Sequence, residues 1–152
     1  MITNGNFNEY TGSETGAFYD IPAGSTTLTG WAIEGNVVRI QSGTSSWGSP
    51  PAVAGTHFIA LHNTQGGTIS ITVNGLVVGH AYMLLWYERD RASNAARTLS
   101  VTTGNTQATS ADITLSASHT VPDDWTQVVA VFTATASSMV ARFHCPGGNT
   151  DG

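Results

Sequence analysis

The feature that most constrains the fold is the alternation of apolar and polar residues with a period of two along most of the chain. Residues 68–73 alternate hydroxyl and aliphatic side chains, and residues 81–89 hold the longest such run. Successive side chains of a β-strand point to opposite faces, so this pattern predicts half-buried strands. No segment shows the 3.6-residue period of a helix, which indicates an all-β chain.

Further strands are predicted where short apolar runs stand between Gly, Asn, Asp or Pro residues: 31–34 and 36–41 with a break at Gly35, 57–62, 98–102, 112–116, 125–135 and 138–145. Turn signals about every ten residues are typical of a sandwich or barrel. Two stretches without strand signals, at about 8–29 and 42–55, are predicted to be long loops. The 152 residues fit a single domain, 1–152.

The charge content excludes several classes of partner. The chain has no lysine, five arginines and a formal net charge of −5, and only 10% of its residues are charged. Nucleic-acid binding depends on neutralising phosphates, so we expect no nucleic-acid partner. We also expect no membrane insertion, because no apolar run approaches the ~20 residues of a membrane-spanning helix.

The cellular location of the protein can be predicted only from its amino-acid composition and its N-terminal residues. Cys145 is the sole cysteine, so it forms no internal disulfide and leaves the redox compartment open. Residues 1–5 lack the charged and apolar regions of a signal peptide. A surface of hydroxyls and amides rather than ions favours an extracellular or particle-surface setting, a virion among them.

Four segments, in order, resemble one known family. Ile2–Phe7, Gly30-Trp31, Gly67–Leu84 and Trp125–Phe143 are similar to conserved segments of galactose-binding-like β-sandwiches, which include carbohydrate-binding modules of polysaccharide hydrolases. The resemblance covers almost the whole chain. It implies a two-sheet antiparallel jelly-roll sandwich and binding of a glycan, although a fold alone does not imply a function.

Two departures from the family pattern concern the chain's ends. The resemblance implies a structural calcium ion near the N-terminus, and here the candidate oxygens belong to Asn6 and Glu9, with Asn8 at the usual acidic position. The family's final strand is expected to be missing from this sequence, which ends at residues 149–152 where that strand should begin. A continuation of the chain or a strand from a partner would complete the sheet.

Candidate ligand-binding residues follow from the alternation and from what sugars require. Sugar rings stack on aromatic faces, and amides or guanidiniums fix their hydroxyls. If the resemblance places Tyr82 and Phe132 in the core, their neighbours face outward. The expected patch on one sheet face comprises Tyr87, Arg89, Gln127, Arg142 and His144, with Trp47 or Tyr19 overhanging it from the loops. The alternative is that loops cover this face.

The remaining tryptophans and the one dense cluster of charged residues are predicted to have structural roles. Trp31, Trp86 and Trp125 are predicted to lie in the core. The cluster Glu88–Arg91 could clamp a carboxylate, but an ion pair or a solvated strand end is more typical of such a run.

The sequence contains no recognisable catalytic or zinc motif, and the adjacent Asp123 and Asp124 follow Pro122 in a turn. Glycosidase carboxylates face each other across a cleft instead. The sequence therefore favours a non-catalytic glycan- or surface-binding module within a larger assembly. The alternative is a structural or decoration protein of a virion or cell-surface layer, whose subunits associate through sheet edges.

Overall fold

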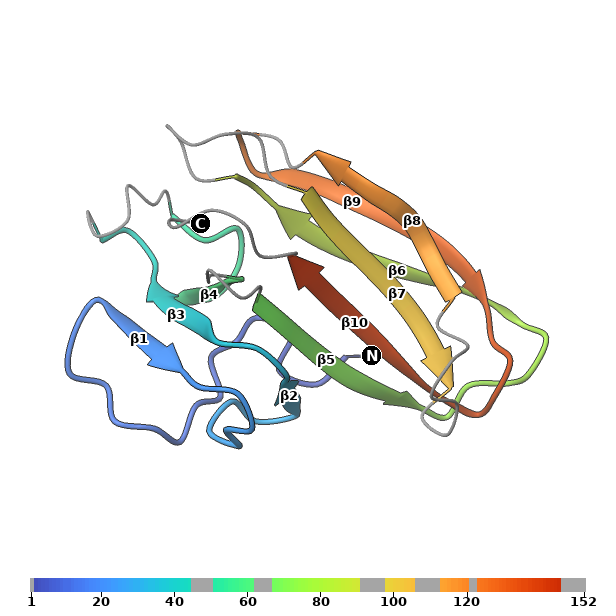
Figure 1. The fold of residues 1–152 in the computed structure, drawn as a ribbon, viewed down its shortest axis with the longest axis horizontal. Coiled ribbons are helices and arrows are strands. Elements are labelled where there is room, and N and C mark those ends of the chain that lie inside the picture. The colour runs from blue at the N-terminus through green and yellow to red at the C-terminus, as the bar shows by residue number, and fades with distance from the viewer. Residues whose placement is uncertain are drawn as a thin grey trace.

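Ten β-strands make up the described part of the protein (Figure 1). The structure is a computed structural model that describes residues 2–44, 51–61, 67–90, 98–105, 113–120 and 123–145. The strands are β1 (Phe18–Ile21), β2 (Trp31–Ile33), β3 (Val37–Gln41), β4 (His57–Ala60), β5 (Gly67–Asn74), β6 (Ala81–Glu88), β7 (Thr98–Asn105), β8 (Ile113–Thr120), β9 (Thr126–Thr133) and β10 (Ser138–Cys145). Across these ranges there is no helix, and hence none that could cross a membrane.

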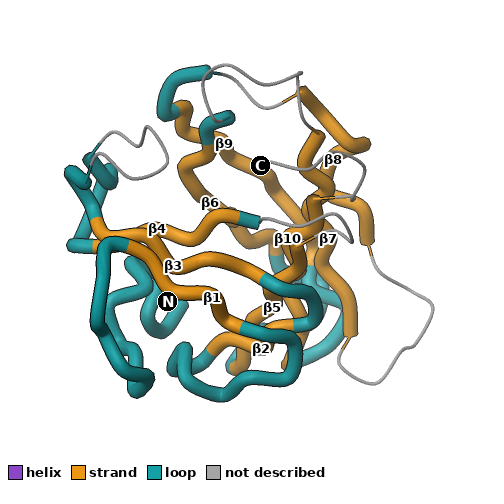
Figure 2. The backbone as a smooth tube through the Cα atoms, turned by 60° about the vertical axis from the view of Figure 1, so that its left-hand side comes forward, coloured by secondary structure: helices purple, strands orange, loops and turns teal. Residues whose placement is uncertain are grey.

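The strands form two layers, as expected for a sandwich. One layer is a five-stranded sheet in the order β2-β5-β10-β7-β8, with β10 paired to β5 and β7. The other layer holds the three-stranded sheet β1-β3-β4 and the two-stranded sheet β6-β9. Figure 2 shows these five strands on one side of the molecule and the five-stranded sheet on the other. All the pairings are antiparallel.

The core lies between the two layers, and strands such as β6 and β10 contribute alternate residues to it. Leu84 of β6 and Phe132 of β9 belong to the same buried cluster as Phe143 of β10. Phe143 lies between two tryptophans, with ring centroids 6.2 Å from Trp31 and 5.7 Å from Trp86. The prediction that Trp31 and Trp86 pack in the core is confirmed.

Most expected strands are present within a few residues of their predicted bounds, and the prediction for residues 138–145 matches β10 at both ends. The expected loop at 8–29 contains a short strand, β1, because Phe18–Ile21 pairs with β3. The predicted absence of a final strand concerns residues after Cys145, which lie outside the described residues.

Candidate functional site

The outer face of the β6-β9 pair carries several exposed hydrophobic side chains. Because side chains alternate, Leu84 and Phe132 point into the core and their neighbours point to solvent. We call this surface the ladder face; it comprises the cross-strand pairs Met83 with Val131, Leu85 with Val129, and Tyr87 with Gln127. Met83 and Val131 are 65% and 69% exposed. No side chain of the ladder face carries a charge.

One end of the ladder face is polar and aromatic. Gln127 donates a side-chain N–H to the Tyr87 hydroxyl oxygen at 2.7 Å, and both residues are exposed. This bond fixes an aromatic ring and an amide side by side, which is the pairing that sugar recognition uses. Of the predicted patch, Tyr87 and Gln127 are therefore brought together.

Trp125 extends this polar and aromatic end. It comes directly before β9, two residues before Gln127, and it lies outside the buried core cluster. Its ring meets Phe58 edge-on with centroids 5.6 Å apart, and its indole N–H donates to the carbonyl oxygen of Pro51 at 3.0 Å. The prediction that Trp125 is a core residue is therefore wrong. The outward position predicted for Gln127, two residues later, could have indicated this from the sequence.

Arg89 lies at the same end but is held by the backbone. Its Nε atom is 3.1 Å from the carbonyl oxygens of Asp90 and Asp123, so the side chain ties the end of β6 to the approach to β9. Glu88 and Asp90 are buried, and Glu88 accepts a hydrogen bond from the Trp86 indole at 2.7 Å. This part of the predicted charge cluster is therefore not a solvated strand end, and Arg91 lies outside the described residues.

Arg142 and His144 are on the other layer of the sandwich. Both belong to β10, at the centre of the five-stranded sheet, whereas Tyr87 and Gln127 belong to β6 and β9. The expectation of one shared face is wrong, because alternation shows which side of a strand points outward but not which sheet the strand joins.

The outward residues of β10 form a polar cluster with Glu34. The two carboxylate oxygens of Glu34 accept from the Ser70 hydroxyl and from Arg142 Nε, each at 2.7 Å. Burial raises the pKa of Glu34, but these two hydrogen bonds and the nearby charges of Arg142 and His144 together lower it below its usual value. His144 Nδ1 lies 2.8 Å from the Thr68 hydroxyl, and burial together with the nearby Arg142 charge lowers its pKa.

Of the two predicted overhanging aromatics, Tyr19 is described, and its contacts lie around β1 and β3 rather than on the ladder face. Tyr19 pairs with Arg39 on the adjacent strand, its hydroxyl bonds to the backbone of Gly16, and its ring lies near Tyr10. Trp47 lies outside the described residues, and its ligand-binding role stays a prediction.

The N-terminal segment is organised around the buried side chain of Arg39. Its Nε donates to the carbonyl oxygen of Phe7 at 3.0 Å and its Nη2 to that of Asn8 at 3.4 Å, while Nη1 pairs with the carboxylate of Glu14. Arg39 Nη2 also lies 3.0 Å from His57 Nδ1. Only 1% of Arg39 is exposed, so this network secures the segment to β3.

The donor set near Asn6 and Glu9 does not fit a calcium site. The side-chain oxygen of Asn6 accepts from the backbone N–H of Asn8, and the backbone of Glu9 bonds to the Asn4 side chain. The neighbouring carbonyl oxygens already bind the Arg39 guanidinium, whose charge repels a second cation. Among the described residues no three His, Cys, Asp or Glu side chains come together as a metal site.

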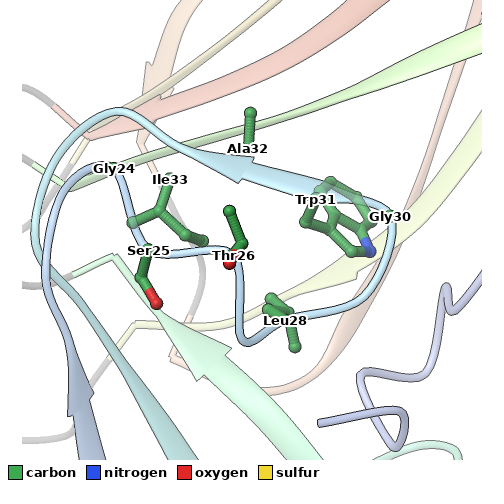
Figure 3. A pocket seen from close by; sticks show the side chains of 8 residues that line it. All are labelled: Gly24, Ser25, Thr26, Leu28, Gly30, Trp31, Ala32 and Ile33. Atoms are coloured by element: carbon green, nitrogen blue, oxygen red, sulfur yellow. The ribbon is translucent and has the colours of Figure 1, made fainter. Parts of the chain in front are cut away.

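A hollow of about 410 Å³ lies beside the edge strand β2, far in sequence from the ladder face (Figure 3). Figure 3 shows the loop before β2 folding back along the strand. The residues that line the hollow are Gly24, Ser25, Thr26, Leu28, Gly30, Trp31, Ala32 and Ile33. None of the predicted ligand-binding residues is among them.

Comparisons with known proteins agree with this architecture. The solved structure of the CBM22-1 xylan-binding domain from Paenibacillus barcinonensis Xyn10C superimposes with a TM-score of 0.54 at 15% identity, over 89% of this chain and 94% of that one. A CBM4 carbohydrate-binding-module structure gives a TM-score of 0.52 at 15% identity, over 99% of this chain and 92% of that one. The predicted all-β sandwich is confirmed as a fold of the carbohydrate-binding-module kind.

Sequence comparison identifies the family directly. No curated protein matches the chain. A family model described as "Protein of unknown function (DUF642)" matches residues 1–152. The chain therefore belongs to the DUF642 family.

Proposed function

We propose that this protein is a non-catalytic module that binds a glycan at the polar and aromatic end of the ladder face. The observation that carries the proposal is the exposed Tyr87 ring held beside the Gln127 amide, with the Trp125 ring two residues before Gln127. A pyranose stacked on an aromatic face presents its hydroxyls to such an amide. The fold shared with a xylan-binding domain and a CBM4 module supports the same conclusion.

The site matches a neutral rather than a charged ligand. The described ladder face has no charged side chain, and Arg89 beside it is bonded to backbone carbonyl oxygens. A single site of this kind binds weakly and gains from repetition, which suits a module within a larger assembly. We also propose an extracellular or particle-surface location and a relationship to galactose-binding-like domains, on the composition and the ordered sequence segments.

The test is binding of soluble polysaccharides by affinity electrophoresis and calorimetry. We expect Tyr87→Ala and Trp125→Ala to weaken the best ligand at least ~10-fold, because each removes a stacking surface. Arg142→Ala is the matched control, since it lies on the other layer and should leave the affinity unchanged. Absence of binding to any glycan at ~10 mM, or equal loss in the control, would contradict the proposal.

A structural or decoration role is the second candidate, and one observation favours it. The other end of the ladder face is aliphatic, with Met83, Leu85, Val129 and Val131 exposed together. Exposed apolar patches with polar rims are typical of protein contacts. In this role the partners are other protein subunits of an assembly.

A further inference from the structure

We infer that His57 is a pH-sensitive switch, and that acid opens the seam between the N-terminal segment, residues 4–14, and strands β3 and β4. The Arg39 guanidinium holds this seam closed, because it bonds to two carbonyl oxygens of the segment and pairs with Glu14. His57 of β4 lies against the same guanidinium, and only 1% of Arg39 and 9% of His57 are exposed. A charge gained by His57 would therefore lie beside a buried cation, with little water to screen the two.

The closed seam requires a neutral His57. Arg39 Nη2 lies 3.0 Å from His57 Nδ1. A guanidinium has only donors, so Nδ1 must accept this hydrogen bond and the single imidazole proton is on Nε2. Protonation adds a second proton at Nδ1, so that two donors and two positive charges face each other. The hydrogen bond is then lost and repulsion takes its place.

The Thr56 hydroxyl gives protonated His57 another partner. Its oxygen lies 2.9 Å from His57 Nδ1, and it donates its own proton to Asn8 Oδ1 at 3.0 Å. The oxygen can therefore accept from a protonated Nδ1. The two bonds that Thr56 makes across the seam to Asn8 are exposed, so water can replace them at little cost. The buried contacts of Arg39 thus decide whether the seam is closed.

The other ionisable groups around this pair do not cancel the repulsion. Glu14 pairs with Arg39, but 46% of its side chain is exposed, and one carboxylate cannot neutralise two cations. The Tyr10 ring lies 4.7 Å from Arg39 Cζ, and Tyr19 of β1 is the register partner of Arg39; phenols carry no charge in acid. Burial, followed by the Arg39 charge, lowers the pKa of His57, and Glu14 offsets only part of this effect.

The opening should be local, because the other anchors of the segment contain no ionisable group. The Asn4 side chain donates to the carbonyl oxygen of Thr29 at 2.9 Å, and the Trp31 indole donates to the carbonyl oxygen of Asn4 at 3.0 Å. The backbone N–H of Thr11 donates to the carbonyl oxygen of Thr27 at 2.9 Å. Acid leaves these bonds unchanged, so the segment stays attached to residues 27–31 while it separates from β3 and β4.

Proton linkage sets the size of the effect. With the seam open, His57 is in water and titrates near its ordinary value of 6.5, whereas the closed seam lowers its pKa. Below pH 6.5 the open form therefore binds a proton that the closed form does not. Each further pH unit raises the ratio of open to closed molecules about 10-fold, until the pH reaches the pKa of the closed form. Between pH 7 and pH 5 we expect a rise of at least ~10-fold.

The experiment is hydrogen exchange of the full chain at pH 7 and pH 5, measured by NMR and expressed as protection factors to remove the intrinsic effect of pH. The probe is the Thr56 amide, which donates to Asn8 across the seam, and the reference is the Thr11 amide on the far side of the segment. Protection of Thr56 should fall at least ~10-fold in acid, and that of Thr11 should hold.

Two variants assign the change to His57. His57→Asn offers a side-chain oxygen to Arg39 and cannot be protonated, so Thr56 should keep the same protection at both pH values. His144→Asn is the matched control, because it removes the other imidazole with a lowered pKa, on β10 in the other layer. It should show the same loss of Thr56 protection as the unaltered chain.

Three results would overturn the inference: Thr56 protection that acid leaves unchanged, an equal loss in His57→Asn, or an equal loss at Thr11, which would mean global unfolding. If His57→Asn does not fold, the titration of the His57 ring protons in the unaltered chain decides. Its midpoint should coincide with the loss of Thr56 protection, and a His57 that titrates while the seam stays closed would refute the switch. None of these measurements depends on glycan binding.

Discussion

The Gln127 side-chain amide donates to the Tyr87 hydroxyl oxygen at 2.7 Å across the β6-β9 ladder. Tyr87→Phe keeps the ring and removes this acceptor, so the amide loses its fixed orientation. We expect glycan affinity to fall about 5- to 10-fold, which corresponds to about 1 kcal/mol. Calorimetry with the best polysaccharide measures this.

Tyr82→Phe is the matched control, because the Tyr82 hydroxyl faces the other way and accepts from the backbone N–H of Val77 at 2.8 Å. It should reduce stability without changing the affinity. Equal losses of glycan affinity in Tyr87→Phe and Tyr82→Phe would mean that the Tyr87 hydroxyl has no specific role in glycan binding.

Replacing Arg39 should be far more damaging to stability than its distance from the ladder face suggests. Arg39→Met fills a similar volume but leaves the Phe7 and Asn8 carbonyl oxygens without their buried donor. We expect a loss of about 3 kcal/mol in the free energy of unfolding, measured with urea. Arg142→Met removes a half-exposed ion pair with Glu34 and should cost less than about 1 kcal/mol. Similar losses of unfolding free energy in Arg39→Met and Arg142→Met would contradict the idea that burial makes the Arg39 hydrogen bonds more important.

The strands could be predicted from the sequence because burial of one face imposes the period of two, as in β10. The pairing of the strands could not, because nothing local in His144 or Gln127 indicates which sheet each strand joins. Because the strand pairing could not be predicted, Arg142 and His144 were expected on the same face as Tyr87, whereas they lie on the other layer. The Arg39 network was not predicted either, since its partners lie up to 32 residues away and three of them are backbone or imidazole atoms.

Thr103 offers a gain in stability. It lies on β7, is 1% exposed, and its hydroxyl has no hydrogen-bond partner among the described residues. A buried hydroxyl without a partner costs about 1–3 kcal/mol, so the nearly isosteric Thr103→Val should raise the free energy of unfolding by about 1 kcal/mol. A rise in the thermal midpoint checks this, and a fall would mean that the hydroxyl is hydrogen-bonded in solution.

Stability should fall as the pH is lowered from 7 to 5. Burial, reinforced by the Arg39 charge at His57 and the Arg142 charge at His144, lowers the pKa of both imidazoles below 6.5. Below pH 6.5 the unfolded chain therefore binds protons that the folded chain does not, and the folded state loses stability until the pH reaches the folded pKa values. The lowered pKa of Glu34 extends the loss below pH 4.5.

Urea unfolding at steps of pH measures this slope. The His57→Asn variant should show a smaller slope of unfolding free energy against pH between pH 7 and 5, because it lacks one of the two imidazoles with a lowered pKa. A slope that the variant does not change would assign the pH dependence to other groups.

Calcium should leave the stability of the described fold unchanged. The resemblance implies a calcium ion near Asn6 and Glu9, yet the Arg39 guanidinium takes the carbonyl oxygens of Phe7 and Asn8 beside them. Calcium needs six to eight oxygens, and a resident cation this close both occupies the oxygens and repels the ion. Melting curves in calcium and in a chelator should therefore coincide. A midpoint that rises with calcium, and no longer does so in Asn6→Ala, would instead establish the site and require Arg39 to release at least one carbonyl oxygen.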